Sequence, residues 1–87
     1  MHYVYVLKSQ KNGSLYIGYT HDLKRRVEEH NAGKSFSTRK QIPYDVVYYE
    51  AYKSASDAKH REGNLKKFSG AYTHLKKRAK NSLIDSK

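Results

Sequence analysis

Cysteine is absent from this chain of 87 residues, so neither a disulfide nor a thiolate metal site can form in it. That absence fits a reducing cytoplasm, which is where we expect the protein to act. The opening residues, Met1 to Lys8, are too short and too polar for the core of a signal peptide, and no later apolar run approaches a membrane span. We therefore expect no membrane association.

Apolar and acidic residues are both scarce. Hydrophobic residues make up 37% of the chain, which has nine tyrosines, and each buried phenol needs a partner for its hydroxyl. Only 8 Asp and Glu oppose 18 Lys and Arg, so the formal net charge is +10. This density attracts polyanions and favours nucleic acid as the partner, ahead of a basic protein without that role or one that binds an anionic membrane surface.

The first half of the chain has the pattern of two strands followed by a helix. Aromatic and β-branched residues fill 3–7 and 14–19, and turn-forming residues separate them, which predicts a β-hairpin. Thr20 offers a capping hydroxyl for a helix over about 22–31, and Gly33 is placed just past its end. Residues 34–43 form a basic loop.

The second half predicts one strand and two helices. Residues 45–52 are almost continuously apolar, which indicates a strand buried on both faces. Ser54 and Asp57 form a capping box before a helix over 55–67. One-sided apolar spacing predicts a basic helix over about 69–83, and we expect the last four or five residues to fray.

The expected fold is therefore α+β. It is a small three-stranded antiparallel sheet flanked by helices, in the order β-β-α-β-α-α. The length suffices for one domain over residues 1–87, with its core at about 1–67, and no repeat or linker suggests a second.

On a helical wheel of the first helix, Leu23 and Val27 form the buried stripe, and Arg26 and His30 lie at its edge. An arginine held at a core edge is well placed to bind a phosphate, although it can equally cover apolar surface with its stem. His30 has an alternative explanation too, because the helix macrodipole favours a histidine at a C-terminus.

On the second helix, Ala58 and Leu65 mark the inner stripe and Glu62 falls in the middle of it. An unpaired carboxylate there would cost several kcal/mol, so it needs a cation. The cation can be Arg26 or a lysine, or it can be a hard divalent metal. Gly63 weakens this helix by about 1 kcal/mol relative to alanine, which indicates crowding or a close approach at that position.

Strand alternation places Tyr3, Tyr5 and Leu7 on one face of the first strand, and Tyr16 and Gly18 on one face of the second. The hairpin can therefore present two phenols side by side, either as a packing pair or as two hydroxyls in a cleft. Since Gly18 has no side chain, another group can approach the backbone there.

Taken in order, these residues resemble the GIY-YIG nuclease family. The matching segments are Tyr3-Val4-Tyr5, Tyr16-Ile17-Gly18, residues 20–26 with His30, and Arg61-Glu62. The resemblance covers about residues 1–67 and is strongest toward small standalone bacterial and archaeal members, which are similar to the nuclease module of excision-repair incision subunits. Tyr3 stands where the first glycine of the family name would be, a variation familiar in the small members.

The resemblance implies a role for each matched residue. Tyr5 would be the general base, for which nearby cations must lower its pKa from about 10. Tyr16 would help to orient the attacking water, and Arg26 would bind the phosphate oxygens as charge develops. Glu62 would hold Mg²⁺ or Mn²⁺ as a Lewis acid, with His30 in support. The asparagine that some members use after the glutamate cannot be assigned from the sequence.

Six basic residues outside the motif would hold the nucleic acid backbone without reading bases: Lys34, Arg39, Lys40, Lys76, Lys77 and Lys80. The resemblance thus implies a metal-dependent endonuclease that hydrolyses DNA with little sequence preference, in DNA repair or processing. Branched or single-stranded DNA fits this reading, the charge permits RNA too, and no protein partner can be named.

Two alternatives stay open. One is a catalytically weak nucleic-acid-binding module of the same fold, in which Glu62 pairs with Arg26. The other is a ribosome-associated or otherwise RNA-directed basic protein, which the charge permits and no motif supports.

Overall fold

A computed structural model describes residues 1–84. Its centre is a three-stranded antiparallel sheet in the order β2-β1-β3. The strands are β1 (His2–Ser9), β2 (Leu15–Thr20) and β3 (Tyr44–Tyr52). The helices are α1 (Leu23–Asn31), α2 (Ala55–Lys67), α3 (Ser69–Arg78) and α4 (Lys80–Ile84), with a 3₁₀ turn, η1, at Arg39–Gln41. The expected α+β class, antiparallel sheet and element order are confirmed.

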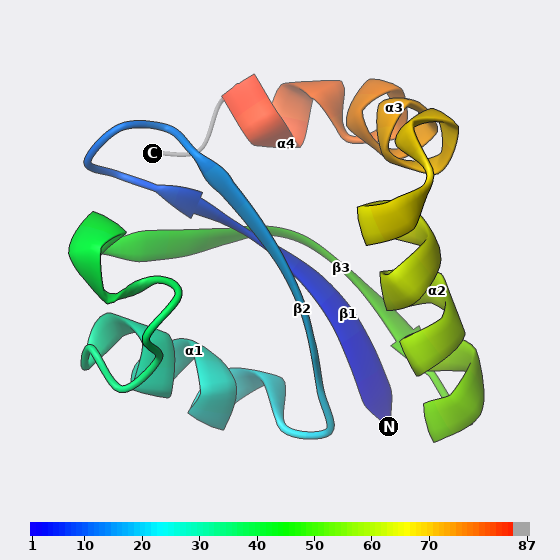
Figure 1. The fold of residues 1–87 in the computed structure, drawn as a ribbon, viewed down its shortest axis with the longest axis horizontal. Helices are drawn as coiled ribbons and strands as arrows, with labels where there is room; N and C mark the ends of the chain where they lie inside the picture. Colours follow the sequence, from blue (N-terminus) through cyan, green and yellow to red (C-terminus); the bar gives the residue numbers. More distant parts are fainter. Residues whose placement is uncertain (85–87) are drawn as a thin grey trace.

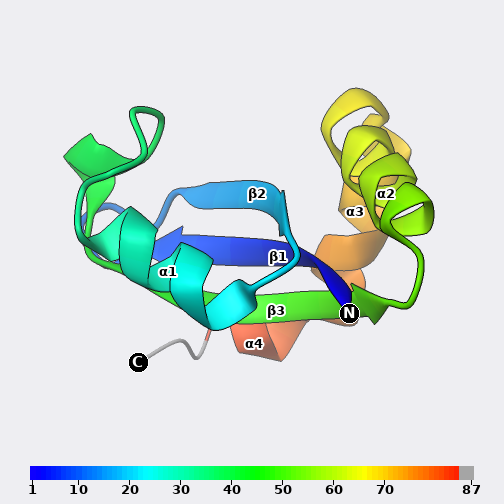
Figure 2. The ribbon, with the colours of Figure 1, turned by 90° about the horizontal axis from the view of Figure 1, so that it is seen from below.

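Helices lie on both sides of the sheet. The first side carries α1 and the loop that follows it, and the second carries α2, α3 and α4 (Figures 1 and 2). None of the helices within residues 1–84 combines the length and the apolar character needed to cross a bilayer.

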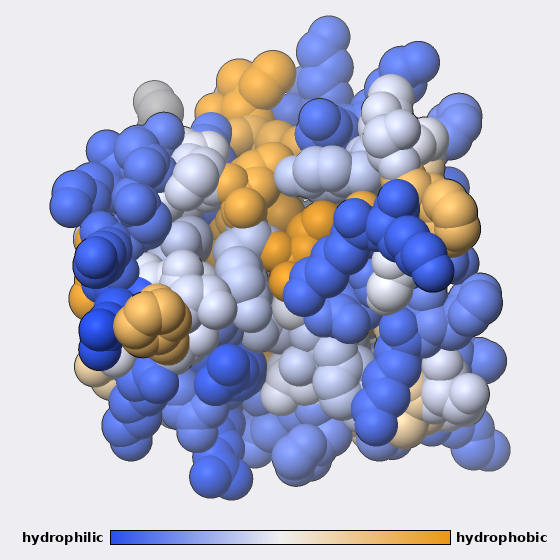
Figure 3. Space-filling model, viewed as in Figure 1, coloured by the Kyte–Doolittle hydropathy of each residue, from blue (hydrophilic) through white to orange (hydrophobic). Residues whose placement is uncertain are grey.

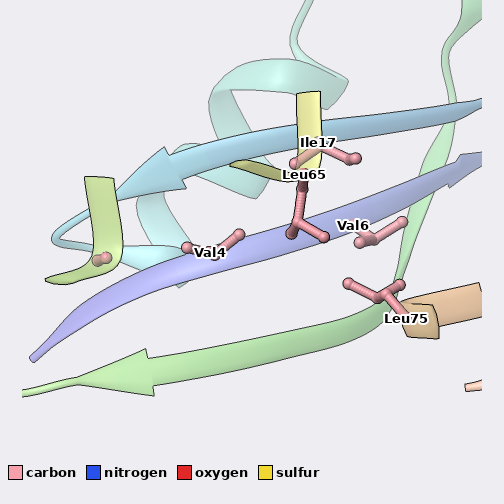
Figure 4. Close-up of a cluster of buried hydrophobic side chains, with 6 residues drawn as sticks. Val4, Val6, Ile17, Leu65 and Leu75 are labelled. Carbon is pink, nitrogen blue, oxygen red and sulfur yellow. The ribbon is translucent and has the colours of Figure 1, made fainter. Parts of the chain in front are cut away.

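The two faces of β1 build two separate cores. Val4 and Val6 pack with Ile17, Leu65 and Leu75 on the side of α2 and α3 (Figure 4). Tyr5 and Leu7 of the same strand point to the other side, toward α1, as the strand alternation predicted. The residues that pack with them there are Tyr44, Tyr16, Leu23, Val27 and Ile42. Because β1 is the central strand, four consecutive residues of it, 4–7, are buried.

The expected burial of both faces of the third strand is wrong. In the described chain β3 is an edge strand, and Val46 and Tyr49 are exposed, with Tyr49 at 54%. Four of the nine residues of β3 are tyrosines, which can turn their hydroxyls to water and still cover apolar surface. A run of such residues therefore does not require a central strand.

Asp22, and not Thr20, caps α1. The Asp22 carboxylate accepts a backbone N–H from the first turn, while the Thr20 hydroxyl accepts the N–H of Asp22 itself at 3.1 Å. At the other end Gly33 has a φ of 78°, and the N–H of Lys34 reaches back to the carbonyl of Glu29 at 3.1 Å. This Schellman ending confirms the expected place of Gly33.

The second helix has the expected bounds, and the Ser54 side chain accepts the N–H of Asp57 at its start. The single helix expected over 69–83 is instead divided at Ala79, a buried residue between α3 and α4. The expected crowding at Gly63 is wrong, since no described atom apart from the neighbouring backbone of its own helix comes within 4 Å of where its Cβ would stand. The expected fraying of the last residues falls mainly on 85–87, outside the described residues.

Candidate active site

Three buried side chains from three segments form a hydrogen-bonded chain beneath α1. Tyr5 comes from β1, His30 from the last turn of α1, and Thr38 from the basic loop. The Tyr5 hydroxyl oxygen lies 2.8 Å from Nε2 of His30, and Nδ1 of the same ring lies 2.7 Å from the Thr38 hydroxyl. Both ring nitrogens are therefore engaged, which fixes the orientation of the imidazole.

The surroundings of His30 favour its neutral form. Its side chain is fully buried, and burial lowers its pKa, as does the nearby charge of Arg26. A neutral ring gains little from the helix macrodipole, so the lowered pKa of His30 counts against that explanation. A neutral imidazole donates from one nitrogen and accepts at the other, so His30 can receive a proton.

The ring of Tyr5 lies across the backbone of β2 at Gly18, its partner in the strand register. Any Cβ at Gly18 would overlap the Tyr5 hydroxyl and ring carbons. The close approach expected at this glycine is thus confirmed, and Tyr5 is the group that approaches. Tyr16 completes the cluster, with its ring centroid 6.4 Å from that of Tyr5 and 5.1 Å from that of His30.

Arg26 stands at the rim of this cluster, one third exposed, with its guanidinium 3.0 Å from the Glu29 carboxylate. Burial raises the pKa of Tyr5 to about 12, and the neighbouring Arg26 opposes that rise without reversing it. Tyr16 and Glu62 raise the pKa of Tyr5 further. The protein's own groups therefore leave Tyr5 protonated at neutral pH.

Glu62 lies at the margin of the inner stripe of α2, and not in its middle as expected. Ala58 and Leu65 are buried, whereas the Glu62 side chain is 24% exposed. Its carboxylate pairs with Nζ of Lys66 at 2.8 Å, so of the cations left open the structure pairs it with a lysine and not with Arg26. Nζ of Lys66 also lies 5.7 Å from the centre of the Tyr16 ring. The Glu62–Lys66 pair therefore lies beside the cluster of Tyr5, Tyr16 and His30, which we call the tyrosine cluster.

At this site, the carboxylate of Glu62 is the group that can bind a metal. Among residues 1–84, no three His, Asp or Glu side chains gather into a ligand cluster. Mg²⁺ commonly keeps several waters and binds through one or two carboxylates together with substrate phosphates. The partly exposed Glu62 fits that kind of shared site, and it does not fit an all-protein cage.

A hollow of about 250 Å³ opens beside Arg26 at the start of α1. Two arginines border it, and Glu29 pairs with both, so an anion entering the hollow would compete with that carboxylate for the two guanidinium groups. Its lining residues are Thr20, His21, Asp22, Arg25, Arg26 and Glu29.

The structure separates the six basic residues expected to bind the nucleic acid backbone. Lys34, Arg39 and Lys40 lie in and beside the loop after α1, on the side of the sheet that carries the tyrosine cluster. Lys76, Lys77 and Lys80 lie in α3 and α4, on the opposite side (Figure 1).

Sequence reasoning missed Thr38 and Lys66. Thr38 stands in a segment that reads only as a polar loop, and no local signal marks it for burial. Lys66 follows Glu62 by four residues on a helix, a spacing that favours an ion pair and could have identified it.

Comparison with known proteins settles the family. The model of the GIY-YIG catalytic domain matches residues 1–81. The chain belongs to the GIY-YIG family. The GIY-YIG domain is a nuclease domain, and that implies a nucleic acid substrate.

Relatives of this GIY-YIG chain are small proteins as well. It is 45% identical over 69 residues to a UPF0213 protein of Staphylococcus haemolyticus, covering 78% of this chain and 83% of the relative. It is 43% identical over 72 residues to a UPF0213 protein of Halobacterium salinarum, covering 82% and 92%. The solution NMR structure of a UPF0213 protein from Bacillus halodurans, 37% identical, aligns over 99% of this chain and 84% of that one with a TM-score of 0.47.

Proposed function

We propose that this GIY-YIG chain is a divalent-metal-dependent endonuclease that hydrolyses phosphodiester bonds in DNA. The observation that carries the proposal is the cluster itself. The Tyr5 hydroxyl touches a neutral histidine, and the charges of Arg26 and Glu62 act on the same hydroxyl. Tyr5 of β1 and His30 of α1 are thus in direct contact, with Arg26 at the rim of the cluster and Glu62 of α2 linked to Tyr16 through Lys66.

Proton removal from the attacking water falls to Tyr5 and His30. With a pKa of about 12, Tyr5 is not ionised at neutral pH. Tyr5 can still serve as the general base if two proton transfers are coupled. It takes a proton from water while its own hydroxyl proton passes to Nε2 of His30, 2.8 Å away. This requires His30 to carry its hydrogen on Nδ1, where Thr38 can accept it.

The remaining residues handle charge and position. Arg26 lies at the rim of the hollow, where its guanidinium can bind the non-bridging oxygens as negative charge builds up. Tyr16 stands against Tyr5 and His30 and helps to orient the water. Glu62 would hold Mg²⁺ or Mn²⁺, which would supply Lewis-acid stabilisation of the leaving oxygen.

We infer low sequence preference, because the basic residues placed around the site are suited to phosphates. We propose DNA repair or processing as the setting, on the strength of the family resemblance.

One observation favours a second candidate, a nucleic-acid-binding module with little activity. Lys66 already holds one oxygen of the carboxylate that a metal would need, and Tyr5 remains protonated. For the nuclease to work, the lone-pair sites of Glu62 that Lys66 leaves open must suffice to hold the metal.

Cleavage assays separate the two candidates. Supercoiled plasmid, branched DNA, single-stranded DNA and RNA are incubated with the purified chain in Mg²⁺, Mn²⁺ or a chelator. We expect nicking of DNA with metal only, and a loss of about 100-fold or more in Tyr5→Phe. Tyr49→Phe, at an exposed tyrosine of β3, is the matched control and should cut like the wild type.

Two results would overturn the nuclease proposal. If the wild type binds DNA and leaves every substrate intact in both metals, the chain is a binding module. If Tyr5→Phe cuts as fast as the wild type, the activity comes from another residue or a contaminant.

A further inference from the structure

Phe36, in the loop between α1 and η1, is 80% exposed. Figure 3 shows an apolar patch over this loop, surrounded by hydrophilic surface. A single exposed apolar residue is ordinary on protein surfaces and indicates nothing by itself. Its surroundings decide whether it has a role.

Those surroundings are cationic. The Arg39 guanidinium carbon lies 4.7 Å from the centre of the Phe36 ring, and Lys34 and Lys40 belong to the same short loop. Residues 32–44 include no Asp or Glu, although the chain contains eight. An aromatic ring among cations is the combination that proteins use to stack a nucleobase while they hold its backbone.

The loop holds Phe36 outward on buried anchors. Ser35 and Thr38, on either side of it, are buried, and the Ser35 carbonyl accepts the N–H of Arg39 at 3.0 Å. The loop backbone that carries Phe36 therefore needs little ordering before the ring can bind a planar ligand. Through Thr38 and His30 the same loop is hydrogen-bonded to Tyr5.

We propose that Phe36 and Arg39 form a binding site for one unpaired nucleobase, which stacks on the Phe36 ring while Lys34 and Lys40 bind the adjoining phosphates. A base inside an intact duplex already has both faces stacked and must leave the helix to reach this ring. The site therefore favours a strand that is unpaired beside the bond to be cut. This inference deepens the proposed function. Base stacking on Phe36 does not depend on the nuclease proposal, whereas the statement about the bond to be cut rests on it.

Tryptophan fluorescence tests the stacking directly, because the natural chain contains no tryptophan. Phe36→Trp places a single indole at the site, and Phe68→Trp places one at the other phenylalanine, which is 55% exposed and follows two lysines. Both are titrated in chelator with oligothymidylate and with a duplex of equal length. We expect strong quenching by the single strand at Phe36→Trp and little at Phe68→Trp.

Affinity measurements complete the test. Phe36→Ala should weaken binding of the single strand about 5- to 100-fold and binding of the duplex less than about twofold, as expected for one lost base stack. Phe36→Tyr should retain wild-type affinity, and Phe68→Ala is the matched control. Circular dichroism and thermal unfolding confirm that each variant is folded.

Three outcomes would overturn the proposal: equal losses on single strand and duplex, quenching equal at both tryptophans, or self-association that Phe36→Ala abolishes, which would make this a contact between copies. Because chelator prevents metal-dependent cleavage, the test does not depend on activity. A chain that stacks a base on Phe36 and never cuts DNA would leave this inference standing and remove the nuclease proposal.

Discussion

Glu50 in β3 and Glu62 in α2 are two partly buried carboxylates with opposite surroundings. Glu50 accepts four hydrogen bonds, two from Arg61 at 2.9 and 3.0 Å and one each from the hydroxyls of Tyr48 and Tyr52. Burial would raise the pKa of Glu50, but these bonds outweigh it and lower that pKa to about 2. Glu62 has one ion pair, with Lys66, and more exposure.

The difference separates a structural carboxylate from one that is available to a ligand. A carboxylate has about four lone-pair sites, and the internal partners of Glu50 occupy as many. Glu62 retains unused sites and faces the tyrosine cluster through Lys66. The two are also linked, because Arg61 precedes Glu62 in α2 and so the Glu50 pair fixes the helix that presents it.

The largest effect on cleavage should follow from a change at Gly18, which belongs, like Glu62, to the candidate active site. In Gly18→Ala the new methyl group overlaps Tyr5, which must move away from His30. We expect cleavage to fall about 100-fold or more and the free energy of unfolding to fall by about 1 to 3 kcal/mol. Plasmid nicking and urea unfolding measure both, and wild-type nicking in this variant would show that Tyr5 need not lie against Gly18.

Glu50→Gln should affect stability and spare the site. Removing one partner of a largely buried ion pair leaves Arg61 without its carboxylate, and we expect a loss of about 2 kcal/mol, below the range for fully buried pairs because both side chains keep some exposure. The exposed Glu28→Gln is the control and should change stability by less than about 0.5 kcal/mol. Equal urea midpoints for Glu50→Gln and wild type would contradict a structural role.

The same pair predicts a pH dependence. The pKa of Glu50 is about 2 in the folded chain, below its ordinary value of 4.5, so the unfolded chain binds the proton more readily. The stability advantage of the wild type over Glu50→Gln is therefore full above about pH 4.5 and shrinks as pH falls toward 2. Urea midpoints of both proteins across this range provide the test, and a difference that grows on acidification would refute the assignment.

A smaller pH effect should come from His30. Burial lowers the pKa of His30 below its ordinary 6.5, so the unfolded chain takes up this proton first as the pH falls. His30 therefore favours the folded state above pH 6.5, and its contribution declines below that value. Histidine proton resonances followed by NMR should show the ring of His30 titrating below pH 6.5, and a midpoint at or above that value would contradict the effect of its burial.

The smallest effect should be a gain in stability at Gly63. No described atom stands where its Cβ would be, and glycine is unfavourable inside a helix. Gly63→Ala should therefore raise the free energy of unfolding by about 0.5 to 1 kcal/mol and leave cleavage unchanged. A loss of stability in urea unfolding would point to crowding that the structure does not contain.

Local patterns predicted the parts of the fold that local interactions determine. The hairpin, the Ser54 cap and the bounds of α2 follow from alternation and capping chemistry, and so does the glycine ending of α1. The burial of β3 and the capping role of Thr20 were predicted wrongly, because the position of a strand in the sheet and the competition between neighbouring caps are not encoded in one segment.

The candidate site was predictable in its residues and less so in its contacts. Tyr5 and His30 are 25 residues apart, and their hydrogen bond exists only because α1 packs on the face of β1 that Tyr5 occupies. The wheel placed Glu62 in the middle of the inner stripe, whereas 24% of its side chain is exposed, because a wheel gives the direction of a side chain and not its depth. The burial of Thr38 depends on how the basic loop returns beneath α1, which its sequence does not reveal.

Nicking of supercoiled DNA in Mg²⁺ by Glu62→Gln and Glu50→Gln, at a temperature where urea unfolding shows both to be folded, tests the central contrast most directly. We predict that Glu62→Gln keeps its stability within about 0.5 kcal/mol of wild type and loses cleavage by about 100-fold or more. Glu50→Gln should be less stable and cut within about threefold of the wild type, since its carboxylate does not face the reacting phosphate. Wild-type cleavage by Glu62→Gln, or equal losses in the two variants, would contradict the account.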